Sequence, residues 1–217
     1  MEECKKYIIL VGNCRAGKTT FVNRIITGDF TKIYLSTIGF DLKKKVIKVD
    51  EHNYNIYFLD TSGINIRNNF SVLTNHINTN GIIYMYDIAD RESFDSIPEW
   101  IENTKDMIKD KKNCSMFMIG SKLDLEEKRI VTEEEGRKFA EQNGMHFLEL
   151  SSTDKESVNK SMLFIIKKIL NLSDDFSGKI MMGSKNINEK ENEKQDHCCC
   201  EKEKENEKQG RSCCLII

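Results

Sequence analysis

Eight consecutive residues, Gly12-Asn13-Cys14-Arg15-Ala16-Gly17-Lys18-Thr19, combine two glycines, a lysine and a hydroxyl at a spacing suited to binding phosphate. The glycines let the backbone wrap around an anion, and the loop N–H groups point inward beside a helix N-terminus. In this pattern the lysine reaches the β- and γ-phosphates of a nucleotide, and the Thr19 hydroxyl binds Mg²⁺. The segment predicts a P-loop, with Thr20 as the next residue of the site.

Two shorter patterns follow other apolar runs. Asp60-Thr61-Ser62-Gly63 contains an aspartate that can hold Mg²⁺ through a water and a glycine whose N–H can contact a γ-phosphate. Gly120-Ser121-Lys122-Leu123-Asp124 contains a carboxylate that can accept from both N–H donors on the Watson–Crick edge of guanine, which adenine lacks. Each pattern alone is typical of a turn or a solvated loop. Their order and spacing, together with the P-loop, favour a guanine-nucleotide site.

The elements that must position these patterns alternate between short apolar runs and helical patterns. The runs have the length and β-branched or aromatic content of buried strands: Tyr7–Val11, Val46–Val49, Tyr54–Leu59, Gly81–Tyr86, Ser115–Ile119 and His146–Leu150. The helical patterns are Lys18–Ile26, Ser93–Lys109, Thr132–Asn143 and Lys155–Leu170. This alternation predicts an α/β fold with a mainly parallel sheet of six strands and helices on both faces. The region Val46–Leu59 reads as a hairpin, which would give one antiparallel edge strand.

Composition sets the other limits. The chain has 217 residues and a formal net charge of −2, without the basic excess of a dedicated nucleic-acid binder. We expect no secretory signal at the N-terminus, and no stretch has the roughly 18–20 apolar residues of a membrane span. Residues 1–172 are expected to form one domain. Residues 173–217, rich in Lys, Glu, Asn and Gln, are expected to form a disordered tail.

The three patterns together resemble the Ras superfamily of small GTPases, and within it the Rab branch, over about residues 7–170. Further residues carry the resemblance. Thr37 lies in Ser36-Thr37-Ile38-Gly39 like the switch I threonine that binds Mg²⁺, and Phe30 matches the aromatic residue that stacks on the base. Ser151-Ser152 is similar to the loop whose backbone meets guanine O6. The resemblance implies the fold of a P-loop NTPase, the small G domain.

The resemblance also implies a set of site residues. Those expected to bind GTP or GDP are Asn13, Cys14, Arg15, Ala16, Gly17, Lys18, Thr19, Thr20, Phe30, Tyr34, Thr37, Gly63, Ser121, Lys122, Asp124, Leu125, Ser151, Ser152 and Thr153. Thr19, Thr37 and Asp60 are the expected Mg²⁺ ligands. Lys18, Thr37 and Gly63 are the residues expected to act in GTP hydrolysis.

Several positions depart from the family pattern. Ile64 stands where the family has the glutamine that orients the attacking water, and isoleucine has no donor or acceptor, so we expect slow intrinsic hydrolysis. Ser121 replaces the asparagine of N-K-x-D, which predicts loss of one amide donor and of a bridge to the P-loop. Thr153 replaces a lysine, and Leu59 stands where Rab proteins have tryptophan.

The cysteines near residue 217 predict lipid attachment. Cys213-Cys214-Leu215-Ile216-Ile217 resembles the doubly prenylated Rab ending. Cys198, Cys199 and Cys200 lie between two copies of the heptapeptide EKENEKQ, which suggests either a slipped low-complexity linker or a duplicated lipidation segment.

The Rab resemblance implies location at the cytoplasmic face of an endomembrane or the plasma membrane, with a cytosolic pool. It also implies several kinds of partner. These are an exchange factor, a GTPase-activating protein, effectors that bind switch I and switch II, prenylation machinery and a chaperone of the GDP-dissociation-inhibitor type. No nucleic acid is expected among them.

The resemblance implies a membrane-anchored GTP/GDP switch in vesicle trafficking. Two other functions are alternatives to it. A GTP-binding module with negligible hydrolysis, acting as an effector-recruiting scaffold, is favoured by Ile64. A P-loop kinase would need a phosphoryl-acceptor pocket with an Arg-rich lid, and the sequence contains no such cluster.

Overall fold

The structure, a computed structural model, describes residues 4–30, 37, 39–63, 78–105, 108, 113–176 and 179–182. Its strands are β1 (Cys4–Val11), β2 (Phe40–Val49), β3 (His52–Thr61), β4 (Thr79–Asp87), β5 (Ser115–Ser121), β6 (His146–Glu149) and β7 (Ile180–Met182). Its helices are α1 (Lys18–Thr27), α3 (Arg91–Asp95), α4 (Ile97–Thr104), the 3₁₀ helix η2 (Leu123–Lys128), α5 (Glu133–Gln142) and α6 (Lys155–Ile169).

The strands form one sheet in the order β6-β5-β4-β1-β3-β2-β7. All the pairs from β6 to β3 are parallel, as the alternation of strands and helices predicts. The predicted hairpin is also present, because β2 pairs antiparallel with β3 across a turn in which Asp50 has a φ of 50°. The parallel strands end near Asp60, Asp87 and Ser121, so residues that follow them share one edge of the sheet.

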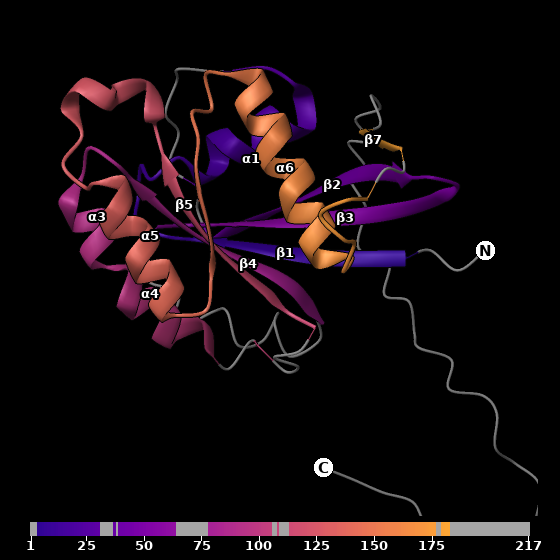
Figure 1. The fold of residues 1–217 in the computed structure, drawn as a ribbon, viewed down its shortest axis with the longest axis horizontal. Coiled ribbons are helices and arrows are strands. Elements are labelled where there is room, and N and C mark those ends of the chain that lie inside the picture. The colour runs from indigo at the N-terminus through magenta and orange to yellow at the C-terminus, as the bar shows by residue number, and fades with distance from the viewer. Residues whose placement is uncertain are drawn as a thin grey trace, which may run out of the picture. The chain divides into compact units, whose positions relative to one another are not determined.

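Helices cover both faces of the sheet (Figure 1). Helices α1 and α6 pack on one face, where Phe21 and Met162 join a core that includes Ile8 and Phe58. Helices α3, α4 and α5 cover the other face, around a second core that includes Trp100. The single helix expected over Ser93–Lys109 is divided at Ser96, which ends α3 and precedes α4, with Pro98 in the first turn of α4.

The sheet has one strand more than the predicted six, and the antiparallel strand β2 is not at its edge, because β7 pairs with its other side. Strand β7 lies in the segment 173–217 that composition predicted to be disordered, and it pairs antiparallel with Ile47–Val49 of β2. Two hydrogen bonds fix its start, since the Lys179 N–H donates to Asp50 Oδ1 and the Asp50 N–H donates to the Lys179 carbonyl, each at 2.9 Å. Phe176, Ile180 and Met182 pack against the first core, so apolar contact offsets the entropy of ordering this short strand.

No helix within the described part of the chain is both long enough and apolar enough to cross a membrane.

Candidate nucleotide-binding site

The P-loop connects β1 to α1, and its two glycines are required by its conformation. Gly12 has a φ of 141°, and a Cβ there would lie 2.1 Å from the Met85 carbonyl oxygen of β4. Gly17 has a φ of 90° and precedes α1, whose first turn contains no acidic residue and receives no side-chain cap from the described residues. The N–H groups of this turn therefore remain available to an anion, which the positive end of the helix dipole favours.

Lys18 is buried at the start of α1 and folds back over the loop. Its ammonium group donates to the carbonyl oxygens of Gly12 at 2.7 Å and Asn13 at 2.9 Å. Burial lowers the pKa of Lys18 to about 8, although the carboxylate of Asp60 opposes the shift. The folded chain thus holds a cation away from water with little compensating charge, and a bound phosphate would supply that charge.

Three oxygen-bearing side chains predicted to hold Mg²⁺ lie close to Lys18. The hydroxyl oxygens of Thr19 and Thr37 are 3.0 Å apart. Asp60 is fully buried in β3, and neither of its carboxylate oxygens has a hydrogen-bond partner among the described residues. Burial raises the pKa of Asp60. The nearby Thr19 hydroxyl and the Lys43 ammonium lower this pKa, but by less than burial raises it. An unpartnered buried carboxylate beside two hydroxyls fits a hard divalent cation such as Mg²⁺.

Gly63 lies directly against the P-loop. A Cβ at this position would be 2.1 Å from the Cys14 nitrogen and 2.5 Å from the Asn13 carbonyl carbon, so no larger residue fits without displacing backbone. The neighbouring Ser62 N–H donates to the Gly39 carbonyl at 2.8 Å, which joins this segment to the start of β2. The predicted site residues Ile64 and Tyr34 lie outside the described residues.

Ser121 corrects one sequence-based expectation. Its buried hydroxyl donates to the Ala16 carbonyl oxygen at 2.8 Å, so the bridge to the P-loop that replacement of asparagine was expected to remove is present. The serine side chain reaches the P-loop carbonyl beside Gly17, where a Cβ would lie 3.4 Å from Ser121 Oγ, an ordinary contact distance. The segment at the end of β5 is therefore tied to the phosphate-binding loop.

The predicted base-recognition residues come from two loops that meet. The Ser151 hydroxyl donates to Asp124 Oδ1 at 2.5 Å, and it also receives the Thr153 N–H at 3.1 Å. Leu125 donates its N–H to the carbonyl of Lys122 at 2.8 Å. This hydrogen bond closes a turn that contains Asp124. The hydrogen bond from Ser151 therefore fixes the orientation of the Asp124 carboxylate.

Lys122 makes a contact that the sequence analysis did not find. Its ammonium group pairs with Asp87 Oδ2 at 2.6 Å, and Lys122 itself has a left-handed φ of 63°. Asp87 is the last residue of β4, so the ion pair joins the ends of two neighbouring strands. The structure also describes four other predicted residues. Thr20 lies in α1 and Phe30 shortly after it, whereas Arg15 lies in the P-loop and Ser152 beside Ser151.

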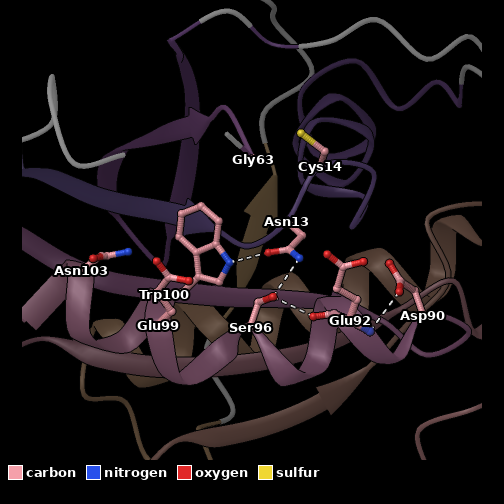
Figure 2. A pocket seen from close by; sticks show the side chains of 9 residues that line it. All are labelled: Asn13, Cys14, Gly63, Asp90, Glu92, Ser96, Glu99, Trp100 and Asn103. Atoms are coloured by element: carbon pink, nitrogen blue, oxygen red, sulfur yellow. Dashed lines mark hydrogen bonds between the residues drawn. The ribbon is translucent and has the colours of Figure 1, made fainter. Parts of the chain in front are cut away.

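Two residues that no sequence pattern identified, Ser96 and Trp100, also contact the P-loop. The Trp100 indole N–H donates to Asn13 Oδ1 at 2.8 Å, and Asn13 Nδ2 donates to the Ser96 hydroxyl at 3.0 Å (Figure 2). Only the tertiary structure brings these residues together, because 87 positions separate Trp100 from Asn13. No local pattern in the sequence signals the contact.

The fold and this geometry define a P-loop nucleotide-binding protein built on a mainly parallel sheet. The chain belongs to the Ras family, whose family model matches residues 7–171, and it is a Rab-like small GTPase. It is 30% identical to the GTP-binding protein YPT1 of Saccharomyces cerevisiae over 196 residues, which cover 87% of this chain and 86% of YPT1. It is 33% identical to the Ras-related protein Rab-3D of Mus musculus over 159 residues, which cover 72% and 69% of the two chains. The Ras-related protein Rab-3B of Homo sapiens is 30% identical over 200 residues, with 89% of each chain covered.

Proposed function

We propose that this chain is a membrane-anchored switch in vesicle trafficking that alternates between GTP and GDP and hydrolyses GTP slowly without help. The observation that carries guanine binding is the Asp124 carboxylate, which Ser151 orients beside a segment bridged to the P-loop by Ser121. Guanine offers two adjacent N–H donors to such a carboxylate, whereas adenine does not.

Different residues of the site would bind the phosphates and the Mg²⁺ ion. Lys18 and the loop N–H groups hold the phosphates, and Thr19, Thr37 and Asp60 hold Mg²⁺, which neutralises charge on the phosphate oxygens when bound. Thr37 lies before β2, and Gly63 lies after β3. In the expected switch segments, switch I (Phe30–Phe40) and switch II (Asp60–Phe70), Thr37 and Gly63 would contact a γ-phosphate, and loss of the γ-phosphate would break both contacts.

This proposal assigns partners to the surfaces that change with the nucleotide. Effectors would bind switch I and switch II in the GTP state, while an exchange factor and a GTPase-activating protein would set the rates of cycling. Prenylation of Cys213 and Cys214 would place the protein on the cytoplasmic face of an endomembrane or the plasma membrane. A chaperone of the GDP-dissociation-inhibitor type would maintain a cytosolic pool.

Nucleotide competition tests the core of the proposal. The purified full chain is loaded with a fluorescent GDP analogue in Mg²⁺, and unlabelled GTP, GDP or ATP is added in increasing amounts. We expect GTP and GDP to displace the probe at concentrations at least about a hundredfold below those of ATP, since ATP lacks the donors that pair with Asp124. Equal displacement by ATP and GTP would reject guanine recognition.

A second candidate function, a GTP-holding scaffold with negligible hydrolysis, is favoured by Ile64. Isoleucine cannot hydrogen-bond a water, so nothing at this position orients the nucleophile. Single-turnover phosphate release separates the two functions. A slow but complete conversion of bound GTP supports the switch, and GTP that stays intact until it dissociates supports the scaffold.

A further inference from the structure

The side chain of Asn13 is held at both ends of its amide by helix α4 and the residue that precedes it. Its Oδ1 accepts from the Trp100 indole N–H at 2.8 Å, and its Nδ2 donates to the Ser96 hydroxyl at 3.0 Å (Figure 2). The Ser96 hydroxyl in turn donates to the Glu92 carbonyl of α3 at 2.7 Å. The second residue of the P-loop is thus fixed to the helices that cover one face of the sheet.

Trp100 is the rigid member of this contact. Its side chain is 6% exposed and packs within the second apolar core. Its carbonyl accepts from the Thr104 hydroxyl at 2.9 Å, and that hydroxyl shares a hydrogen bond of 2.7 Å with the fully buried Tyr84 hydroxyl of β4. The main chain of α4 at Trp100 is therefore tied to the central sheet, and burial in the second core holds the indole whose N–H donates to Asn13.

The backbone of Asn13 belongs to the phosphate-binding machinery. Its carbonyl oxygen accepts from Lys18 Nζ at 2.9 Å and from the Ala16 N–H at 3.3 Å, which closes the loop. Gly63 lies against its carbonyl carbon, where a Cβ would come within 2.5 Å. One residue thus joins the fixed indole to the lysine and glycine that are expected to contact phosphate.

We infer that Trp100 is a positioning residue which, through its hydrogen bond to Asn13, holds the P-loop in the conformation that retains nucleotide. A loop already held in its binding conformation loses less freedom when the ligand arrives, and it gives the ligand up more slowly. The inference rests on the proposed nucleotide binding. It adds that α4, outside the sequence motifs, sets the rate of nucleotide release.

The Trp100 indole borders a pocket of about 440 Å³, so its fluorescence can report on this contact. Trp100, Asn13, Cys14 and Gly63 all line the pocket, so the indole borders the space next to the residues that would sense a γ-phosphate (Figure 2). Trp100 is also the only tryptophan in the 217 residues. Tryptophan emission, excited at wavelengths that the six tyrosines do not absorb, therefore reports on this position alone.

The test is a double-mutant cycle on nucleotide release from the full chain. Trp100→Phe removes the indole N–H and keeps an aromatic ring, Asn13→Ala removes the acceptor, and the third variant carries both changes. Trp100→Phe should speed release of a fluorescent GDP analogue about three- to tenfold, the effect of losing one ordinary hydrogen bond. Asn13→Ala should speed release at least as much, because it also removes the hydrogen bond to Ser96. The double variant should release no faster than the faster single variant, because both changes remove the same interaction.

The control separates positioning from a general loss of packing. Ile97→Val removes one methylene from a fully buried residue of the same helix and the same core, without touching the hydrogen bond. It should lower the melting temperature and leave the release rate unchanged. If Trp100→Phe behaves like this control, or if the effects of the two single changes multiply in the double variant, the positioning role is wrong.

Tryptophan emission gives an independent readout. Emission of the wild-type chain should differ between the GDP complex and the complex with a non-hydrolysable GTP analogue, and Asn13→Ala should reduce that difference. Emission that Asn13→Ala leaves unaltered contradicts the contact. Wild-type protein that binds no guanine nucleotide rejects the proposed function and the inference together, whereas unaltered release from nucleotide-bound variants rejects the inference alone.

Discussion

The Ser121 hydroxyl donates a hydrogen bond of 2.8 Å to the carbonyl oxygen of Ala16, a residue 105 positions earlier in the chain. Ser121 ends β5, and Ala16 lies in the P-loop, so this bond joins the base side of the site to its phosphate side. Both residues are almost completely buried, which excludes water as a competing partner. The nucleotide would lie across two segments that already restrain one another.

Loss of this bond should speed nucleotide dissociation. Ser121→Ala removes the donor and leaves the Ala16 carbonyl buried without that partner, so release of a fluorescent GDP analogue is expected to rise about three- to tenfold. Ser161→Ala is the matched control, because the Ser161 hydroxyl makes a hydrogen bond of 2.9 Å within α6, at Ser157. The control should leave release unchanged, and equal rates for Ser121→Ala and wild type would show that the bridge does not restrain the nucleotide.

Asp124 should determine the choice of base. Asp124→Asn replaces an acceptor-only carboxylate by an amide that also donates, so affinity for GTP is expected to fall about ten- to a hundredfold. Affinity for xanthosine triphosphate should rise, because xanthine presents a carbonyl where guanine has its amino group. Competition titrations with both nucleotides measure the exchange of preference.

The control for the base prediction is another aspartate in a defined hydrogen bond. Asp154 accepts the Glu156 N–H at 2.9 Å at the start of α6, and Asp154→Asn keeps an acceptor there. This variant should bind GTP like the wild type. A variant at Asp124 that retained full preference for GTP would place base recognition elsewhere.

Gly63 should discriminate between the two nucleotide states. In Gly63→Ala the new methyl group would meet the Cys14 nitrogen at 2.1 Å, so this segment must withdraw from the P-loop. GDP affinity should stay within about threefold of the wild type, whereas affinity for a non-hydrolysable GTP analogue should fall about tenfold or more through loss of the Gly63 N–H contact. Parallel titrations with the two nucleotides measure the difference, and equal losses for both would mean that Gly63 does not sense the γ-phosphate.

Much of the site was predictable because its signals are local. The P-loop lies between a strand and a helix, and the turn around Asp50 joins two apolar runs, so short-range patterns identified both. Asp60 was placed correctly at the end of a buried strand. Each of these features follows from the order of residues along a few turns of chain.

The features that escaped prediction depend on contacts between distant segments. The run Ile180–Met182 is too short to signal a strand within a polar segment, and it forms because β2 offers an unpaired edge and Asp50 accepts the Lys179 N–H. The Ser121 bridge joins the end of β5 to a P-loop residue 105 positions earlier in the chain. The Trp100 contact with Asn13 exists only because α4 packs beside the P-loop.

Restoring a polar side chain at position 64 should accelerate hydrolysis. Ile64 lies outside the described residues, and the prediction follows from its chemistry, since isoleucine can neither donate to nor accept from the attacking water. Ile64→Gln should raise the single-turnover rate about tenfold or more, because orienting a reactant is worth at least that much. Ile64→Leu keeps an apolar side chain and should leave the rate near that of the wild type. A rate that Ile64→Gln leaves unchanged or lowers would mean that another residue positions the water.

Cys213 and Cys214 should provide the membrane attachment. A single lipid chain gives marginal binding and stable anchoring takes a second signal, which a basic patch can supply. Residues 171–217 contain 8 Lys and Arg against 10 Asp and Glu, a net charge of −2, so this segment gains little from anionic lipid. Two prenyl chains are therefore the expected solution. Replacing both cysteines by serine should move the protein from the membrane fraction to the soluble fraction of fractionated cells.

The three cysteines at 198–200 provide the matched control, because they lie in the same polar segment but are followed by further charged residues rather than by Leu215-Ile216-Ile217. C-a-a-X prenylation modifies a cysteine that only three residues follow, so Cys198, Cys199 and Cys200 are not expected to be modified in that way. Their replacement by serine should leave the protein on membranes. If this triple variant becomes soluble while Cys213→Ser with Cys214→Ser stays on membranes, the internal cluster is the anchor, and the duplicated heptapeptide beside it marks a second lipidation segment rather than a lengthened linker.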